Sequence, residues 1–376
     1  MFPPLGSVVG HPGHVVIGSL DMTSQRFWNS LLLSGLIVIG AAGFSHAASL
    51  SNAPAPAPLS APAGVGPLLD AVKDLPIKAD YDVNSWFVTG HFTAEGHTIS
   101  CLYHVMVMKT PDGQRVIQSV ASITDETTGW YSAGDMLLPY TGEGETADGI
   151  NYSLPNGAMH ITPDGIEAKA TLKNGSLDLQ MTPVSPTLYN GGTGIFPLLG
   201  MTIHEYSVPV MKTTGSITMD GKTYKIDGNG WFDRQWQDNA PAGSQDATWS
   251  WMGLRLDNGD SISLWSAFDG AIGKDRSWAT VLHPDGSQTV AAVEPSLGAA
   301  DEWTSEESGN TYPTRWSVSI PALDVQLDVL PAPRHQEIIS VAPYLTKYEG
   351  ASTVTGSYGG EPITGYGYVE LVGVWK

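Results

Sequence analysis

The sequence predicts an all-β protein whose antiparallel strands close, or nearly close, into barrels. From about Leu68 onward, short runs of alternating apolar and polar residues follow one another, and no long segment has the apolar period of a helix. Glycine (43 residues) and proline (26) are frequent, whereas charged residues make up only 15% of the chain, which suits short strands and tight turns. So many strands need their edges covered, and barrel closure is the usual way to do this.

The N-terminal part has the layout of a secretory signal peptide. Residues 27–44 are nearly uncharged and follow Arg26, and their apolar run from Leu31 to Phe44 is 14 residues long. A membrane-spanning helix needs about 20 such residues, so this run favours a signal that is cleaved near Ala47. An uncleaved signal anchor is the alternative. We therefore expect a secreted or periplasmic protein.

The residues on either side of this apolar run are not expected to belong to a folded domain. Residues 1–21 precede the charged start of the signal, so we expect translation to begin at Met22 and the signal peptide to span residues 22–47. Residues 48–66 are rich in proline and alanine without apolar periodicity, which predicts an extended linker. No later segment is long and apolar enough to span a bilayer, so we expect no stable membrane insertion of the mature chain.

The charge balance and the cysteine count argue against several classes of partner and site. With 38 acidic and 18 basic residues the formal charge is -20, which disfavours binding to nucleic acid or anionic lipid. Cys101 is the one cysteine, so the sequence has no disulfide framework, and its place in an alternating run predicts a core position. Metal-ligand histidine spacing, phosphate-binding glycine loops and serine-nucleophile motifs do not occur. We expect neither a metal nor a cofactor.

Turn residues between paired runs predict β-hairpins. Glycine, asparagine and aspartate accept the left-handed backbone that tight connections between antiparallel strands require. Such residues occur at Pro111–Gly113, Lys173–Gly175, Met219–Gly221 and Asp257–Asp260. Leu68–Lys73 is at most a short helix.

Tryptophan is distributed unevenly and divides the predicted folded part into two. Residues 67–205 contain only Trp86 and Trp130, whereas residues 206–376 contain nine tryptophans. We therefore predict an N-terminal domain over residues 67–205 and a tryptophan-rich C-terminal domain over residues 206–376. Large aromatic side chains line binding cavities well, so the second domain is expected to hold an apolar ligand; ordinary core packing is the alternative.

The hairpin over residues 248–268 is predicted to have one aliphatic face and one tryptophan-rich face, because side chains alternate along a strand. Trp249, Trp251 and Arg255 share one side of its first strand, and Trp265 extends this side on the return strand together with two serines. Solvent exposure explains the serines and the arginine but not three tryptophans. We interpret this face as the wall of an amphipathic cavity.

The segment over residues 228–238 has the highest density of reactive side chains. As a strand it places one set of residues on one face, Trp231, Asp233 and Gln235, and another set on the opposite face, Phe232, Arg234 and Trp236. It is interpreted either as a structural polar cluster or as an acid beside tryptophan rings in an apolar pocket. The second combination can protonate an alkene and hold the developing cation against an aromatic face. A slip of one residue in register exchanges Asp233 and Arg234 at the pocket.

Several of these runs resemble the lipocalin-like hydratase family, which includes carotenoid 1,2-hydratases, kievitone hydratase, secreted AttH-type proteins and decalin-forming Diels–Alderases. The resemblance covers about residues 80–376 and is carried by SWFVTGHFTAEG (85–96), HEYSVP (204–209), GSITMDGKTY (215–224), GNGWFDRQW (228–236), WSWMGLRLDNG (249–259), YEGASTVTG (348–356) and ITGYGYVELVG (363–373). It implies two consecutive lipocalin-like antiparallel β-barrel domains with a ligand pocket in or between them. It also implies an apolar polycyclic or isoprenoid ligand.

At the reactive centre the chain departs from the family pattern. Family hydratases read Asp-His-x-Trp where this chain reads Asp-Arg-Gln-Trp over residues 233–236, and Arg234 stays protonated, so it does not shuttle protons as a histidine does. Where carotenoid hydratases have a Tyr-x-Asp pattern, this chain reads Trp-Ser-Ala over residues 265–267, without the carboxylate. Asp233 is then the remaining acid, and a dry pocket is expected to raise its pKa.

The predicted function is cofactor-free hydration of a carbon–carbon double bond in a hydrophobic, isoprenoid-type molecule. In this hypothesis Asp233 delivers the proton, while Trp231 and Trp236 stabilise the resulting cation. Arg234 or Tyr206 holds the water that adds to it.

Other residues complete the predicted site. His204, at the expected domain junction, is a proton-transfer or orienting group, and Glu370 is an additional pocket residue. Trp249, Trp251 and Trp265 are expected to line the pocket. Two alternatives stay open: a lipocalin-like binding protein that carries an apolar ligand without chemistry, and a cofactor-free cyclase of the Diels–Alderase type in which Arg234 polarises a carbonyl.

Overall fold

The computed structural model describes residues 66–373 except for residues 111, 240–247, 270–273 and 295–297. The predicted start at Met22, the signal peptide over residues 22–47 and all but the last residue of the linker lie outside the described residues. In the part of the chain that is described, no helix is long and apolar enough to cross a bilayer.

The fold is nearly all β, as predicted, and consists of two curled antiparallel sheets, each a half-barrel. The first sheet has twelve strands: β1 (Val83–Ala94), β2 (His97–Lys109), β3 (Arg115–Asp125), β4 (Trp130–Pro139), β5 (Ile150–Leu154), β6 (Gly157–Thr162), β7 (Gly165–Thr171), β8 (Gly175–Pro183), β9 (Leu188–Tyr189), β10 (Ile195–Leu198), β11 (Met201–Met219) and β12 (Lys222–Gln237). The second has ten: β13 (Thr248–Leu256), β14 (Ser261–Asp269), β15 (Lys274–Leu282), β16 (Gln288–Ala292), β17 (Gly298–Thr304), β18 (Thr311–Ile320), β19 (Val325–Pro331), β20 (Glu337–Ile338), β21 (Lys347–Tyr358) and β22 (Glu361–Val372). Three single-turn 3₁₀ helices lie at Asn190–Gly192, Pro321–Leu323 and Pro343–Leu345.

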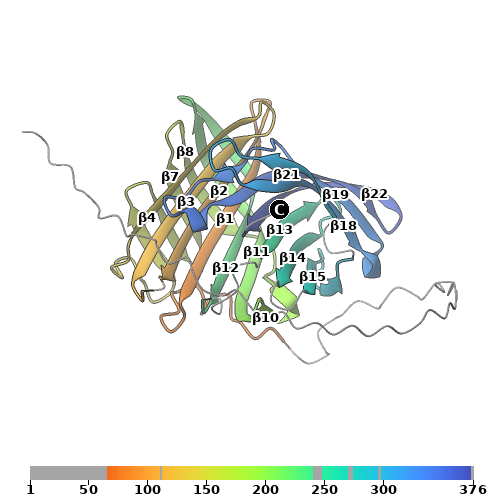
Figure 1. The fold of residues 1–376 in the computed structure, drawn as a ribbon, viewed down its shortest axis with the longest axis horizontal. Coiled ribbons are helices and arrows are strands. Elements are labelled where there is room, and N and C mark those ends of the chain that lie inside the picture. Colours follow the sequence, from red (N-terminus) through yellow and green to blue (C-terminus); the bar gives the residue numbers. More distant parts are fainter. Residues whose placement is uncertain (1–65, 111, 240–247, 270–273, 295–297, 374–376) are drawn as a thin grey trace, which may run out of the picture. The chain divides into compact units, whose positions relative to one another are not determined.

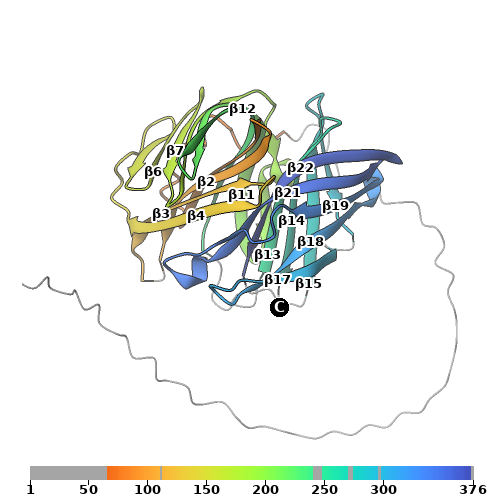
Figure 2. The same ribbon diagram turned by 90° about the horizontal axis from the view of Figure 1, so that it is seen from above.

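Each sheet is mostly a meander in which neighbours in sequence are neighbours in space. The first sheet runs in the order β4-β3-β2-β1-β12-β11-β8-β7-β6-β5, with β9 and β10 also paired to β11 (Figure 1). The second runs in the order β16-β15-β14-β13-β22-β21-β19-β18-β17, with β20 paired to β21 (Figure 2). In both sheets an early strand pairs with a late one, β1 with β12 and β13 with β22, and this long-range pairing brings distant residues to the same site.

The change from one sheet to the other comes later than the predicted domain boundary. That boundary, between residues 205 and 206, lies inside β11, a strand of 19 residues that pairs with β8 and β12 of the first sheet. The chain enters the second sheet only between β12 and β13. The tryptophan count placed the boundary too early because Trp231 and Trp236, counted with the second half, lie on β12.

The predicted hairpin turns connect β2 to β3, β7 to β8, β11 to β12 and β13 to β14. At the third of these, Asp220 and Gly221 have positive φ angles of 46° and 82°, the conformation that favours aspartate followed by glycine. The patch Leu68–Lys73 is not a helix. There the Asp70 carboxylate accepts the amide hydrogens of Val72 and Lys73, both at 3.1 Å, and this holds an isolated turn.

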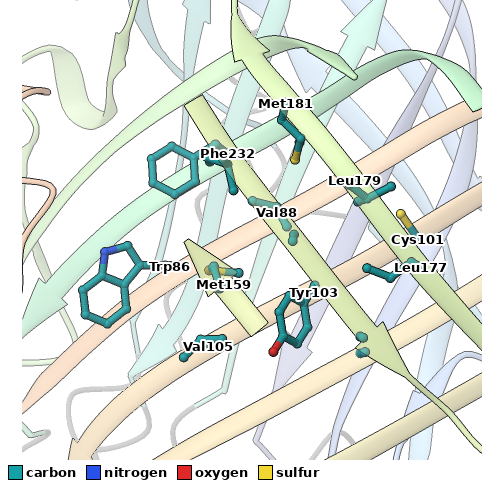
Figure 3. Close-up of a cluster of buried hydrophobic side chains, with 14 of the residues drawn as sticks. Trp86, Val88, Cys101, Tyr103, Val105, Met159, Leu177, Leu179, Met181 and Phe232 are labelled. Carbon is teal, nitrogen blue, oxygen red and sulfur yellow. The ribbon is translucent and has the colours of Figure 1, made fainter. Parts of the chain in front are cut away.

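Alternation along the strands separates the buried residues into distinct cores. In β1, Trp86 and Val88 point into the first half-barrel, where Figure 3 shows them with Tyr103, Met159 and Phe232. The lone cysteine, Cys101, is buried in the same cluster, as its alternating run predicted. A second cluster of buried residues fills the other half-barrel.

A third cluster contains residues of both sheets, and we call it the intersheet cluster. Phe87, between Trp86 and Val88 in sequence, points into it rather than into the first half-barrel. Its buried members are Phe87, Leu102, Val120, Leu188, Phe196, Leu198, Met201, Ile203, Trp231, Trp251, Trp265, Ala267, Leu282, Ile338, Ala351 and Tyr368. Hydrogen bonds also join the sheets here, for example between the hydroxyl groups of Ser122 and Tyr368 at 3.0 Å.

Candidate functional site

A small polar chamber lies within the intersheet cluster. Its volume is about 30 Å³, which is room for a water molecule but not for a drug-sized ligand. Three carboxyl groups, one imidazole, one hydroxyl, one amide and three aromatic rings line it. These residues are Ser85, Phe87, His104, Glu205, Asp233, Gln235, Trp251, Trp265 and Glu370.

Strand β12 positions Asp233 in this chamber. In the ladder Asp233 lies opposite Phe87 of β1 and Ser207 of β11, so its neighbours come from the middle of the first sheet. The indole nitrogen of Trp231 donates a hydrogen bond to Oδ1 of Asp233 at 2.7 Å. Burial raises the pKa of Asp233 to about 7, although the hydrogen bonds from Ser207 and Trp231 oppose this rise.

Glu205 is the second acid of the chamber, and it lies on β11 opposite Gln235. Only 2% of its surface is exposed, and burial raises its pKa well above the ordinary value, with the charges of Asp233 and Glu370 adding to the effect. Its Oε2 atom and the indole nitrogen of Trp265 have no hydrogen-bond partner within the described residues. At neutral pH Glu205 therefore keeps its proton, Asp233 is protonated about half of the time, and both acids face one small space.

The third carboxyl group, Glu370 of β22, is ionised. Burial alone would raise its pKa, but Lys347 outweighs this effect and the net shift is downward. The ammonium group of Lys347 lies 2.7 Å from Glu370 and 2.6 Å from Glu349, a residue that is fully buried. Burial raises the pKa of Glu349 well above the ordinary value against the opposing charge of Lys347. Lys347 thus contacts both the ionised Glu370, which lines the chamber, and the neutral carboxyl group of Glu349, which does not.

A hydrogen-bonded chain connects this ion pair to another wall of the chamber. The Lys347 ammonium group lies 3.3 Å from Nδ1 of His104, and burial followed by the charge of Lys347 lowers the pKa of His104 to about 3. Because a protonated lysine only donates, Nδ1 is the acceptor, and the ring hydrogen is on Nε2. Nε2 lies 2.7 Å from the Ser85 hydroxyl, which therefore accepts and keeps its own hydrogen free for the chamber.

Arg234, predicted to hold water or polarise a carbonyl, lies on the opposite face of β12 and away from the chamber. It is fully buried between the rings of Trp86 and Trp236, with Cζ 4.4 and 4.9 Å from the ring centroids. At 2.7–3.3 Å its guanidinium group donates to the carbonyl oxygens of Asp74, Pro76, Ser85 and Gln235 and to the side-chain oxygen of Asn84. Burial lowers the pKa of Arg234 to about 10, so it remains charged, and its role here is structural.

Three more predicted site residues share this far face. The Tyr206 hydroxyl donates to the carbonyl oxygen of Ala71 at 2.9 Å, so it is not available to position a water in the chamber. His204 stacks on Trp236, with ring centroids 5.2 Å apart and an interplanar angle of 12°. Burial lowers the pKa of His204. The alternation of β11 and β12 removes these groups from Asp233 although they are close to it in sequence.

The remaining predicted residues are brought together at the intersheet cluster. Trp251 and Trp265 line the chamber with Asp233 and Glu370, and Trp231 contacts Trp251 edge-to-face at 5.9 Å between centroids. Trp249 is partly buried against the same cluster, and the centroid of its ring lies 6.4 Å from that of the Trp265 ring.

Five residues of the chamber were not predicted as site residues: Ser85, Phe87, His104, Glu205 and Gln235. The supporting Lys347 was not predicted either. Of these, Glu205 could not be placed from the turn alone: the hairpin register counted from Met219–Gly221 pairs it with Trp236, and a β-bulge between Val208 and Met211 shifts it to Gln235, on the face that carries Asp233.

Two further cavities lie near the intersheet cluster. A narrow cavity of about 20 Å³ is lined by Trp231, Gly253 and Tyr368 among others, and an open cleft of about 700 Å³ lies beyond it. Four side chains line both of them: His91, Asn229, Arg255 and Tyr366. Trp231 lines the narrow cavity and also donates to Asp233, so it links this cavity to the chamber. Among the residues that the structure describes, no three or more His, Cys, Asp or Glu side chains are arranged so that they could hold a metal ion together.

Comparison with known proteins agrees with this architecture. The chain is 28% identical over 233 residues to the dehydratase asqC of Emericella nidulans, covering 58% of this chain and 65% of that protein. It is 26% identical over 226 residues to the kievitone hydratase of Fusarium solani subsp. phaseoli, covering 58% and 63%. The matched segments thus span just under two thirds of these curated relatives. The crystal structure of kievitone hydratase from Nectria haematococca superimposes with a TM-score of 0.72 at 22% identity, covering 85% of this chain and 97% of that one.

A family model described as AttH-like matches residues 66–374, which is nearly the whole of the described chain. This match extends through both sheets and includes every residue of the chamber. The chain therefore belongs to the AttH-like family.

Proposed function

We propose that this chain is an exported, cofactor-free acid–base enzyme that adds water to, or removes it from, a carbon–carbon double bond of a hydrophobic, isoprenoid-type molecule. The observation that carries the proposal is the chamber, in which three carboxyl groups lie together: the pKa values of Asp233 and Glu205 are raised, and that of Glu370 is lowered. Two relatives bear the names hydratase and dehydratase, which describe the two directions of this chemistry.

The chamber supplies each group that hydration requires. The carboxyl proton of Asp233 is transferred to one alkene carbon, which forms a C–H bond and leaves a cation on the neighbouring carbon. The faces of Trp231 and Trp251 are the aromatic surfaces available to stabilise that cation. A water in the chamber forms the C–O bond and gives its proton to Glu370, and transfer of this proton to Asp233 restores the starting state. The reverse sequence is dehydration.

The substrate cannot enter the chamber without movement of the aromatic wall, since the space is the size of a water molecule. We therefore assign the body of the substrate to the open cleft and its reacting end to a position beside the Trp231 ring. Because Gly253 has no Cβ atom, the Trp231 and Trp251 rings pack closely against its backbone. A Cβ atom at Gly253 would lie 2.7 Å from Trp251 and 3.3 Å from Trp231.

The test is turnover of isoprenoid alkenes in oxygen-18 water, followed by mass spectrometry. We expect an alcohol that carries one heavy oxygen, and a fall in rate of about 10²–10⁴-fold in Asp233→Asn. Asp227→Asn, at an exposed position of the same strand, is the matched control and should keep the wild-type rate. Retention of the ligand without any product supports a binding protein instead, and a rearranged product without heavy oxygen supports a cyclase.

Export belongs to the proposal because the N-terminal residues have the order of a cleaved signal: charge, apolar run, small residues. Sequencing the N-terminus of the protein recovered from the periplasm or medium tests it. An N-terminus near Ala48 supports cleavage, whereas recovery of the full apolar run in a membrane fraction supports the signal anchor.

A further inference from the structure

We infer that the open cleft contains a recognition site for a carboxylate group of the substrate, centred on Arg255. This inference rests on the proposed function, because it concerns the molecule whose double bond reacts at the chamber. It defines the substrate class more closely: an amphipathic isoprenoid acid whose polar end is held where the cleft meets the narrow cavity.

Arg255 is a cation whose hydrogen-bonding capacity is only partly used, although its side chain also interacts with that of Tyr366. Its Nη1 atom donates to the Ser261 hydroxyl at 2.6 Å and to the carbonyl oxygen of Gly259 at 3.3 Å, which fixes one end of the guanidinium group. Its Nε atom is buried and has no acceptor among the described residues. Within that part of the chain, no carboxylate lies within ion-pair distance of Arg255. A planar group with an unpaired N–H is suited to a carboxylate.

The neighbours of Arg255 add a donor and a rigid wall. Tyr366 of β22 is directly opposite Arg255 in the ladder, and its ring stacks on His91 with centroids 3.9 Å apart and an interplanar angle of 9°. His91 is itself held by Ser100 at 3.1 Å and by Glu126 at 3.2 Å. Asn229 lines the same two cavities. These side chains are the four that connect the cleft to the narrow cavity.

The two acidic residues that line the cleft, Glu126 and Asp257, are already paired with other side chains. Glu126 interacts with His91 and accepts from the Ser100 hydroxyl at 2.6 Å, and Asp257 accepts from the Thr364 hydroxyl at 2.7 Å. Arg255 is the only lysine or arginine among the described residues that line the cleft. An anionic group that enters the cleft therefore has one cationic partner in it, next to the passage that leads to Trp231.

The experiment compares the binding of geranic acid and geraniol, which share a carbon skeleton and differ in the carboxylate, by isothermal titration calorimetry. Since a hydrogen bond to a charged group contributes about 1.5–3 kcal/mol, we expect the wild-type chain to bind the acid about 10-fold to 100-fold more tightly. Arg255→Gln should reduce this preference to about onefold and leave the affinity for geraniol unchanged. Arg255→Lys, which keeps the charge, should retain part of it.

Arg315→Gln is the matched control, because Arg315 is a half-exposed arginine of β18 outside the cleft. It should behave as wild type. Equal affinities for the two probes in the wild type, a preference that survives Arg255→Gln, or binding of neither probe would overturn the inference. Failure of the proposed function is distinguished by Asp233→Asn, which should bind both probes as the wild type does. A wild-type chain that binds geranic acid selectively but never hydrates it contradicts the chemistry and leaves the carboxylate site intact.

Discussion

Asp233 and Arg234 are consecutive residues of β12, yet they lie in opposite environments. Arg234 is enclosed in the first half-barrel, where five oxygen acceptors and two tryptophan rings surround its charge. Asp233 is equally removed from water, but its partners are few, and burial raises its pKa to about 7. The positive charge of Arg234 is thus compensated by oxygen acceptors, whereas a negative charge on Asp233 has few donors to stabilise it.

This difference separates a group that stabilises the fold from a group that can react. A guanidinium group with acceptors on all sides loses these hydrogen bonds if it moves or gives up its proton, and this raises the free energy of the protein. A carboxyl group with a raised pKa exchanges its proton near neutral pH, which is the property that acid–base chemistry needs. The following variants test whether the two faces of β12 have these separate roles.

The largest effect is expected at Arg234. Replacing it with methionine keeps much of the apolar stem but removes the donors for four carbonyl groups and one amide oxygen. We expect the free energy of unfolding to fall by about 3 kcal/mol or more, as measured by urea denaturation. Arg315→Met, at a half-exposed site, should change it by less than about 0.5 kcal/mol. Equal small changes in the two variants would show that the Arg234 contacts do not stabilise the fold.

The opposite sign is expected at Asp233. Its pKa is about 7 in the folded chain and near the ordinary value of 3.8 in the unfolded chain, so the unfolded state loses this proton first as the pH rises. Stability from this group is therefore present below about pH 4 and is lost as the pH rises to about 7. Asp233→Asn does not titrate, so it should be more stable than wild type by about 1–3 kcal/mol at pH 8.

The measurement is a pair of urea unfolding series at pH 4 and pH 8 for both chains. The stability difference should be near zero at the lower pH and reach its full value at the higher one. A variant that is less stable than the wild type at pH 8 would mean that the Asp233 carboxylate is well solvated or paired in the folded protein.

The smallest effect is expected from the two tryptophans of β12. The Trp231 indole donates to Asp233 and lowers its pKa, so Trp231→Phe should raise that pKa by about one unit or less. Trp236→Phe, on the Arg234 face, is the matched control and should leave it unchanged. Carboxyl carbon-13 titration of Asp233 measures both. A shift in the control as large as that in Trp231→Phe would show that the two faces are not independent.

The sequence carried the local part of this arrangement. Strand alternation predicted that Asp233 and Arg234 face opposite ways, and the turn residues at Met219–Gly221 and Asp257–Asp260 predicted two of the hairpins that the structure contains. These features depend on neighbouring residues, so they can be derived from short stretches of chain.

The non-local part could not be derived in this way. The residues near Asp233 in the sequence do not indicate that its face meets Glu370, which is 137 residues away. They also do not indicate that Lys347 lowers the pKa of Glu370 and so stabilises its ionised form. These contacts depend on how the second sheet packs on the first, and on the pairing of β13 with β22. For the same reason Arg234 and Tyr206 were assigned to the site: closeness in sequence does not show which face of a strand is covered by another sheet.

Glu370 lies on β22, the last strand that the structure describes, so Asp233 acquires its raised pKa only after this strand has docked. During synthesis the chamber cannot close before residue 370 has left the ribosome, because that residue forms one of its walls. Until then Asp233 and Glu205 are in contact with water, where ordinary carboxyl groups are ionised at neutral pH. The reactive acid is thus produced by the final docking of strands, so a partly synthesised chain carries only ordinary surface carboxylates.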